Sequence, residues 1–112
     1  MCDNLVDLKE EREARIQRLI SIARALHCPT RWQIIDIIGT KEKRTEEILE
    51  ALWKRGHRLT RPGLYYHLSE LKEAGIIEVA EFIEEGRGAP RKTWKIVMNR
   101  IEIDLLPREA GT

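Results

Sequence analysis

The residues best suited to bind another molecule lie close together in residues 59–77, "LTRPGLYYHLSELKEAGII". The first half of this stretch carries Arg61, Tyr65, Tyr66 and His67. An arginine side chain presents a planar fork of donors that fits the two acceptors on a guanine edge. A tyrosine ring can stack on a sugar or a thymine methyl while its hydroxyl reaches a phosphate. This combination is typical of a surface that binds nucleic acid.

The basic residues of the chain are sorted into two windows that hold no acidic residue. The net charge is only +1, yet residues 52–69 and 86–101 contain nine of the 20 Lys and Arg and none of the 19 Asp and Glu. These basic residues are Lys54, Arg55, Arg58, Arg61, Arg87, Arg91, Lys92, Lys95 and Arg100. Such segregation indicates a surface that faces a polyanion.

Catalysis and metal binding find little support in the sequence. There is no nucleophile–base pair, no Gly-rich phosphate loop and no pair of carboxylates set in an apolar frame. The candidate ligands Cys2, His27, Cys28 and His57 do not have the spacing of a closed zinc site. A thiol at a helix start, as at Cys28, can be a redox sensor or simply a small buried apolar group. We predict no enzyme, no metal and no cofactor.

Three helices are predicted before the tyrosine-bearing stretch. Residues 5–27 and 29–39 carry apolar side chains at steps of three and four, and residues 45–56 form a third helix with Thr45 as its N-cap. The first helix has one apolar stripe, made of Ile16, Leu19, Ile20, Ala23 and Leu26. The predicted buried positions of the next two helices are Trp32, Ile34, Ile35 and Ile38, and Ile48, Leu49 and Leu52.

A fourth helix is predicted over about residues 60–74. Thr60 is a favourable N-cap, Pro62 is tolerated in the first turn, and Gly75 suits the end. Leu64, Leu68 and Leu71 would form its apolar stripe. The cationic and aromatic side chains would then lie on the opposite, exposed face.

After this helix the pattern changes to that of a β-hairpin. Residues 76–85 and 92–98 are rich in β-branched and aromatic residues, and "EGRGAPR" between them suits the tip of a wing at residues 84–93. The length fits one domain, residues 1–112. The predicted class is α+β, a winged helix-turn-helix with helices followed by a β-hairpin wing. Its core should include Trp32, Trp53 and Trp94.

Three segments resemble known winged-helix regulators over roughly residues 23–98. "ALHCPTRWQIIDII" and "LTRPGLYYHLSELKEAGIIEV" resemble the entry motif and the recognition helix of ArsR-type regulators. "EEGRGAPRKTWKI" is similar to the wing of the PadR type. The resemblance implies a dimeric transcriptional regulator that binds double-stranded DNA.

Site residues follow from this resemblance position by position. The groove-facing residues would be Arg61, Pro62, Gly63, Tyr65 and Tyr66, with Thr60 near a phosphate. The wing would bring Arg87, Arg91 and Lys92 to the backbone or the minor groove. Independently of the resemblance, the positive charge of Lys54, Arg55 and Arg58 would add phosphate contacts. The cysteine pair by which many ArsR relatives sense metals would lie in residues 45–56, which contain neither Cys nor His.

Each of these residues also has a structural interpretation. Because adjacent residues of a helix cannot share a face, we expect Tyr65 rather than Tyr66 to touch DNA. His67 should be a hydrogen-bonded structural residue, and Arg31 should pair with a carboxylate or a helix end. Arg61 has few structural reasons to stand at a helix start, where the dipole disfavours a cation. The wing cations could serve solubility alone, although their acid-free run favours DNA.

The ends of the domain are the predicted dimerisation elements. The helix over residues 5–27 and the apolar residues of segment 97–106 exceed what a small core needs, although both could instead cover the core of the monomer. The alternative function is a winged-helix interaction module, or a nucleic-acid-binding module without sequence-specific readout. The chain has no long apolar run and a charged N-terminal segment, so we expect a cytoplasmic protein without a membrane span.

Overall fold

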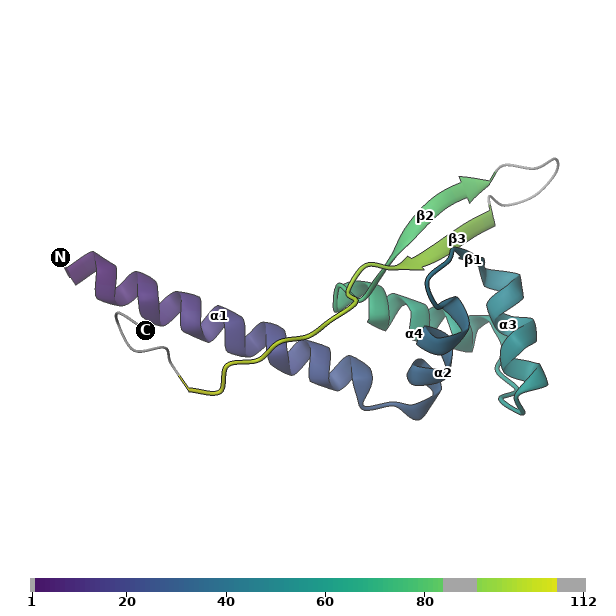
Figure 1. The fold of residues 1–112 in the computed structure, drawn as a ribbon, viewed down its shortest axis with the longest axis horizontal. Coiled ribbons are helices and arrows are strands. Elements are labelled where there is room, and N and C mark those ends of the chain that lie inside the picture. The colour runs from purple at the N-terminus through teal and green to yellow at the C-terminus, as the bar shows by residue number, and fades with distance from the viewer. Residues whose placement is uncertain (1, 84–90, 107–112) are drawn as a thin grey trace.

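The computed structural model describes residues 2–83 and 91–106, which form four helices and three strands in the described ranges (Figure 1). The helices are α1 (Cys2–Leu26), α2 (Pro29–Ile38), α3 (Thr45–Lys54) and α4 (Arg61–Glu73). The strands are β1 (Lys43–Arg44), β2 (Ile77–Ile83) and β3 (Arg91–Ile96). The predicted helices and both strands of the hairpin are therefore confirmed to within a few residues at their described ends, and β1 is an addition.

The strands form one antiparallel sheet in the order β1-β3-β2. Trp94 in β3 pairs with Lys43 on one side and with Val79 on the other. A register shift between Val79 and Glu81 marks a bulge, which bends the strand and increases its twist. Beyond this point β2 and β3 extend away from the helices (Figure 1).

The core lies between α2, α3, α4 and the base of the sheet. The largest side chains that are fully buried are Ile34, Ile38, Ile48, Leu52, Leu64, Leu68, Leu71 and Ile77. Trp94 joins this core as predicted, and its indole Nε1 donates to Oγ1 of Thr45 over 2.9 Å. The wing strand and the start of α3 are thereby tied together.

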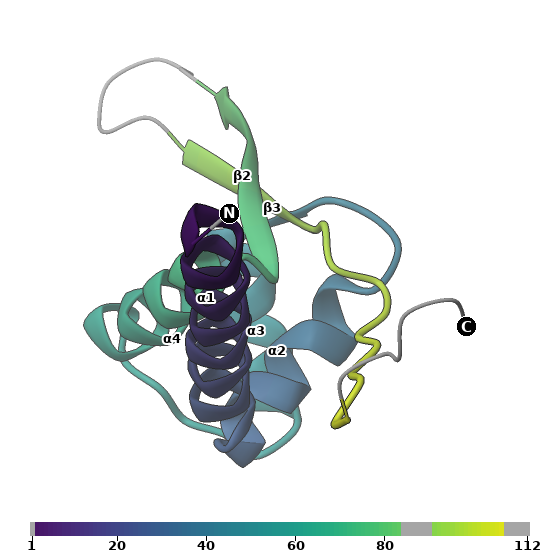
Figure 2. The same cartoon turned by 90° about the vertical axis from the view of Figure 1, so that its left-hand side faces the viewer.

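Helix α1 extends away from this core along the long axis of the molecule (Figures 1 and 2). Its last turns are packed, since Ile22 and Ala25 are buried, whereas Leu8, Ile16 and Ile20 are exposed. The result is an elongated molecule with extents of 60 × 30 × 23 Å. No helix in the described ranges is long and apolar enough to cross a membrane.

Two details of the sequence interpretation are wrong. Thr45 is the first residue of α3 rather than its N-cap; Arg44 occupies the cap position, and its backbone N–H donates to Oε1 of Glu47 over 3.1 Å. Trp32 and Trp53 are not core residues, since about half of each is exposed. Their indole N–H groups donate to the carbonyl oxygens of Leu26 and Leu59 over 2.7 and 2.9 Å. Each ring therefore covers a turn of the chain with one face in solvent.

Candidate nucleic-acid interface

The first turn of α4 is shaped by a side-chain cap. Oγ1 of Thr60 accepts a hydrogen bond of 3.1 Å from the backbone N–H of Gly63, which satisfies one of the free donors at the helix start. A Cβ atom at position 63 would lie only 3.2 Å from that hydroxyl. Glycine therefore leaves room for the cap, and Pro62 has no N–H to satisfy in this turn.

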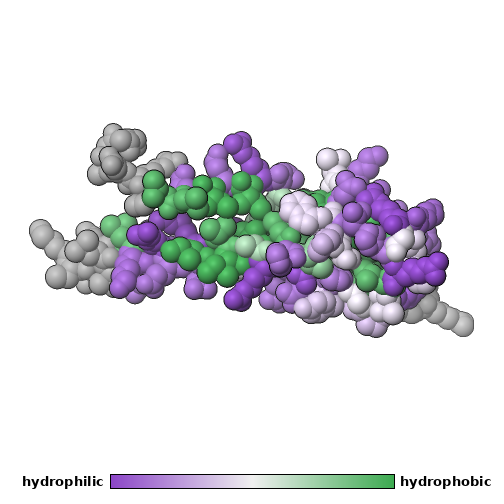
Figure 3. Space-filling model, turned by 90° about the horizontal axis from the view of Figure 1, so that it is seen from below, coloured by the Kyte–Doolittle hydropathy of each residue, from purple (hydrophilic) through white to green (hydrophobic). Residues whose placement is uncertain are grey.

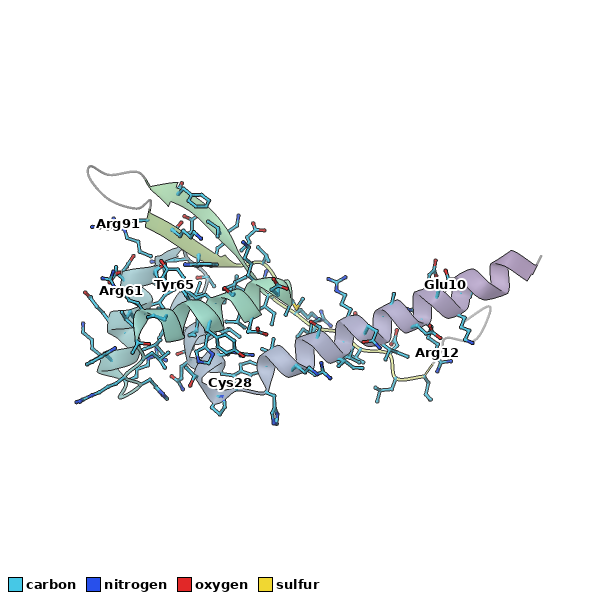
Figure 4. All side chains as sticks on the ribbon, turned by 180° about the vertical axis from the view of Figure 1, so that it is seen from behind. Glu10, Arg12, Cys28, Arg61, Tyr65 and Arg91 are labelled. Atoms are coloured by element: carbon cyan, nitrogen blue, oxygen red, sulfur yellow. The ribbon has the colours of Figure 1, made fainter. Side chains whose placement is uncertain are left out.

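The outer face of α4 carries an arginine and a tyrosine one turn apart. Leu64, Leu68 and Leu71 are fully buried, which fixes the inner face of the helix. Arg61 and Tyr65 are four residues apart and exposed, so they share a face. Figure 4 shows these two residues at the same end of the molecule as Arg91 at the start of β3. Helix and wing strand thus present cationic and aromatic groups together.

Tyr66 lies on a different side of α4 from Tyr65. The Arg31 guanidinium is 5.6 Å from the centre of its ring, and the ring stands edge-on to the imidazole of His67. Tyr66 is nonetheless 59% exposed, more than Tyr65 at 42%. Its packing against α2 is consistent with the expectation that Tyr65, rather than Tyr66, belongs to the interface.

Arg61 has an intramolecular partner that the sequence did not reveal. Its Nη2 lies 2.9 Å from Oε1 of Glu46 in the first turn of α3. Two-thirds of the Arg61 side chain remains exposed. The guanidinium is therefore held at the junction of α3 and α4 and is still accessible.

Arg31 and His67 form a partly buried contact that links three helices. Nε of Arg31 donates to Nδ1 of His67 over 3.1 Å, and Nη1 donates to the carbonyl oxygen of Ala25 at the end of α1 over 3.2 Å. Both residues are structural as predicted, and Arg31 pairs with a helix end, one of the two kinds of partner expected for it. Burial lowers the pKa of His67 below its ordinary value, and the charge of Arg31 lowers this pKa further.

The end of α3 and the turn that follows it carry three of the candidate cations. Arg55 donates from Nη1 to Oδ2 of Asp36 over 2.7 Å and to Oε1 of Gln33 over 2.9 Å, so it links α3 to α2. Arg58 lies over the exposed ring of Trp53 at 5.6 Å. Lys54 is exposed at the end of α3. Of the three, Arg55 has the clearest structural role.

The wing strands add two more cations. Arg91 is exposed at the start of β3, and Nζ of Lys92 lies 5.5 Å from the ring centre of Phe82 and 6.0 Å from that of Trp94. The two rings face the ammonium group of Lys92 in cation–π contacts. Arg87 and the tip of the predicted wing lie outside the described residues.

Comparison with solved structures identifies the architecture. A possible transcriptional regulatory protein from Mycobacterium bovis (fragment 1–100) aligns with 24% identity and a TM-score of 0.58, over 76% of this chain and 80% of that one. NolR from Sinorhizobium fredii aligns with 19% identity and a TM-score of 0.57, over 80% and 78%. This chain has a winged helix-turn-helix fold. The predicted fold class is thus confirmed.

A more distant neighbour has the same fold in part. The ferric uptake regulator of Vibrio cholerae aligns with 17% identity and a TM-score of 0.51, over 66% of this chain and 55% of that one. No family model and no curated protein matches the sequence. At these identities the likeness extends to the winged helix-turn-helix fold, and the ArsR and PadR resemblance stays a prediction from the motifs.

This protein has a second distinctive surface, which is made by α1 and segment 97–106. Exposed apolar side chains gather over this elongated half of the molecule (Figure 3). They are Leu8, Ile16 and Ile20 on the helix and Val97, Ile101, Ile103, Leu105 and Leu106 on the segment. Several exposed apolar side chains gathered on one half of a molecule are typical of a protein interface.

Metal-binding geometry is not seen in the described ranges, where no three His, Cys, Asp or Glu residues come together as a ligand group. Cys28 lies half-buried at the start of α2 as a free thiol.

Proposed function

We propose that this protein is a DNA-binding transcriptional regulator that inserts α4 into the major groove. The observation that carries the proposal is the shared exposed face of Arg61 and Tyr65 on a capped helix, with Arg91 of the wing strand at the same end of the molecule. The two solved neighbours that are named as regulators support a function of this kind. The role is one of binding rather than catalysis, exercised in the cytoplasm.

The candidate contacts divide into base readout and phosphate binding. Arg61 would read a guanine edge, Tyr65 would contact a neighbouring base or sugar, and Pro62 and Gly63 would allow close approach of the helix start. Thr60, Lys54, Arg58, Arg91 and Lys92 would bind phosphates, joined by Arg87 of the wing tip and by Arg55 where its bridge to Asp36 permits.

Fluorescence anisotropy tests this function directly. The protein would be titrated into its own upstream DNA and into a scrambled duplex, from about 50 to 300 mM salt. Tight, salt-dependent binding with a large preference for the upstream DNA is the expected result. Equal, weak binding to both duplexes would favour the alternative, a non-specific or protein-docking winged-helix module. No binding at low salt would refute the DNA function.

We further propose that α1 and segment 97–106 form the interface of a homodimer. The exposed apolar residues on both elements support this, and two-fold symmetry would place two copies of α4 about one helical turn of DNA apart. Light scattering should give twice the chain mass of 13.1 kDa. A mass of one chain at micromolar concentration would refute the dimer and leave the DNA-binding face unaffected.

A further inference from the structure

Glu46 is an acidic residue beside the surface that, in the proposed function, faces the phosphates of DNA. Its carboxylate pairs with Arg61 over 2.9 Å, and 43% of the Glu46 side chain is exposed. Exposed ion pairs contribute little to folding stability. A carboxylate near DNA also opposes binding, because phosphates repel it. Neither the stability of the ion pair nor general DNA affinity therefore explains why this carboxylate faces Arg61.

Helix termini place both members of the pair. Glu46 lies in the first turn of α3, where the helix dipole favours a negative charge. Arg61 is the first residue of α4, where the dipole disfavours a cation, and the first turn of α4 contains no acidic residue. Glu46 supplies the missing negative charge from the neighbouring helix and so fixes the position of the guanidinium.

We propose that Glu46 is a specificity-determining positioning residue, which holds Arg61 in place to read guanine; this inference rests on the proposed function. A guanidinium has five N–H donors, and the contact with Glu46 engages Nη2. Enough donors remain for the O6 and N7 acceptors of a guanine. Because Arg61 is already ordered, less side-chain freedom is lost when the base contact forms.

The carboxylate also acts against unwanted contacts. An unpaired arginine at the helix start could bind any nearby phosphate, which carries no sequence information. With Glu46 beside Arg61, a contact between Arg61 and a phosphate loses part of its electrostatic advantage. The contact between Arg61 and a guanine keeps its two hydrogen bonds. Discrimination is gained at some cost in total affinity.

The test selects binding sites from duplex DNA with a randomised central region. The enriched duplex and the random pool are then titrated with the wild type, Glu46→Ala and Arg61→Ala. A matched control is Glu50→Ala, because Glu50 is exposed one turn further along α3. We expect the wild type to select a guanine at a position where both Arg61→Ala and Glu46→Ala lose the preference.

In Glu46→Ala, the affinity for the enriched duplex should fall while the affinity for the random pool rises. The ratio of enriched-duplex to pool affinity should fall about tenfold in Glu46→Ala, which is within the range for loss of one bidentate base contact. Binding to the random pool should tighten in Glu46→Ala and weaken in Arg61→Ala. Glu50→Ala should keep the guanine preference and the wild-type ratio.

Two failures are distinguishable. If Glu46→Ala keeps the guanine preference that Arg61→Ala loses, the positioning role is overturned and the regulator function stands. If the wild type enriches no sequence, the sequence-specific function fails and this inference fails with it. Circular dichroism checks the fold of each variant, and Glu46→Gln, which keeps the shape and removes the charge, replaces Glu46→Ala if that variant unfolds.

Discussion

The two halves of this molecule differ in how completely they bury their own apolar side chains. In the body made of α2, α3, α4 and the sheet, Ile34, Ile48 and Leu64 are fully buried. In the arm made of α1 and segment 97–106, Leu8 is 61% and Leu105 83% exposed. The body forms its own core, whereas the arm leaves apolar surface that a second chain would cover. Under the proposed function, DNA would lie on the charged face of the body and the partner chain would cover the arm.

The largest effect is expected from a charge placed in the arm. Ile16→Glu would bury an unpaired carboxylate in the proposed dimer interface, at a desolvation cost of several kcal/mol per copy. Light scattering should show the mass falling from two chains to one. Ala14→Glu is the matched control, because Ala14 is exposed and lies on the opposite side of α1. Equal masses for both variants would remove the distinction between the two faces of α1.

A cavity in the body should have a smaller effect than a charge in the arm, but its effect on stability should still be large. Leu68→Ala would leave a void at a fully buried position, lowering the free energy of unfolding by about 3 kcal/mol. Leu105→Ala, which removes the same atoms from an exposed side chain of the arm, should change it by about 0.5 kcal/mol or less under conditions where the protein is monomeric. Chemical denaturation at low protein concentration measures both, and similar losses would contradict the proposed division.

A substitution at the junction of arm and body should have an intermediate effect. Arg31→Met would leave the carbonyl of Ala25 and Nδ1 of His67 without their donor, at a cost of about 2 kcal/mol. The side chain of the introduced methionine keeps much of the packing that the aliphatic part of Arg31 makes. Thermal unfolding followed at 222 nm measures the loss, and an unchanged midpoint would show that these hydrogen bonds do not stabilise the junction.

The smallest effect is expected from pH acting on the same junction. The pKa of folded His67 is lowered, so the unfolded chain binds a proton more readily than the folded one. Stability is therefore fully present above the ordinary value of 6.5 and is lost as the pH falls from there toward the lowered pKa. Denaturation between about pH 7.5 and 5.5 measures this loss. His67→Gln, whose amide oxygen can still accept from Arg31, should show a smaller dependence on pH.

Much of the body was predictable because its signals are local. Thr60, Pro62 and the spacing of Leu64, Leu68 and Leu71 locate α4 within a residue or two, since capping and periodicity act over a few positions. Strand β1 was missed because its two residues are too few to show an alternation. Its pairing depends on β3, which lies half the chain away.

The site was predicted less completely because its pairings cross between helices. Arg61 was identified from its type and place, but Glu46 could not be, since nothing local to either residue links α3 to α4. The contact of Arg31 with His67 likewise joins residues 36 positions apart. Trp32 and Trp53 were assigned to the core because periodicity treats tryptophan as apolar and ignores the donor on its ring.

The three tryptophans give this protein three built-in optical probes. Trp94 lies buried in the body, Trp53 lies beside Arg58 at the turn before α4, and Trp32 covers the end of α1. A buried indole emits at shorter wavelength than one in water, so unfolding should shift the emission of Trp94 to the red. Single-tryptophan variants would then report separately on the core, on the turn before α4 and on the junction with the arm, without any added label.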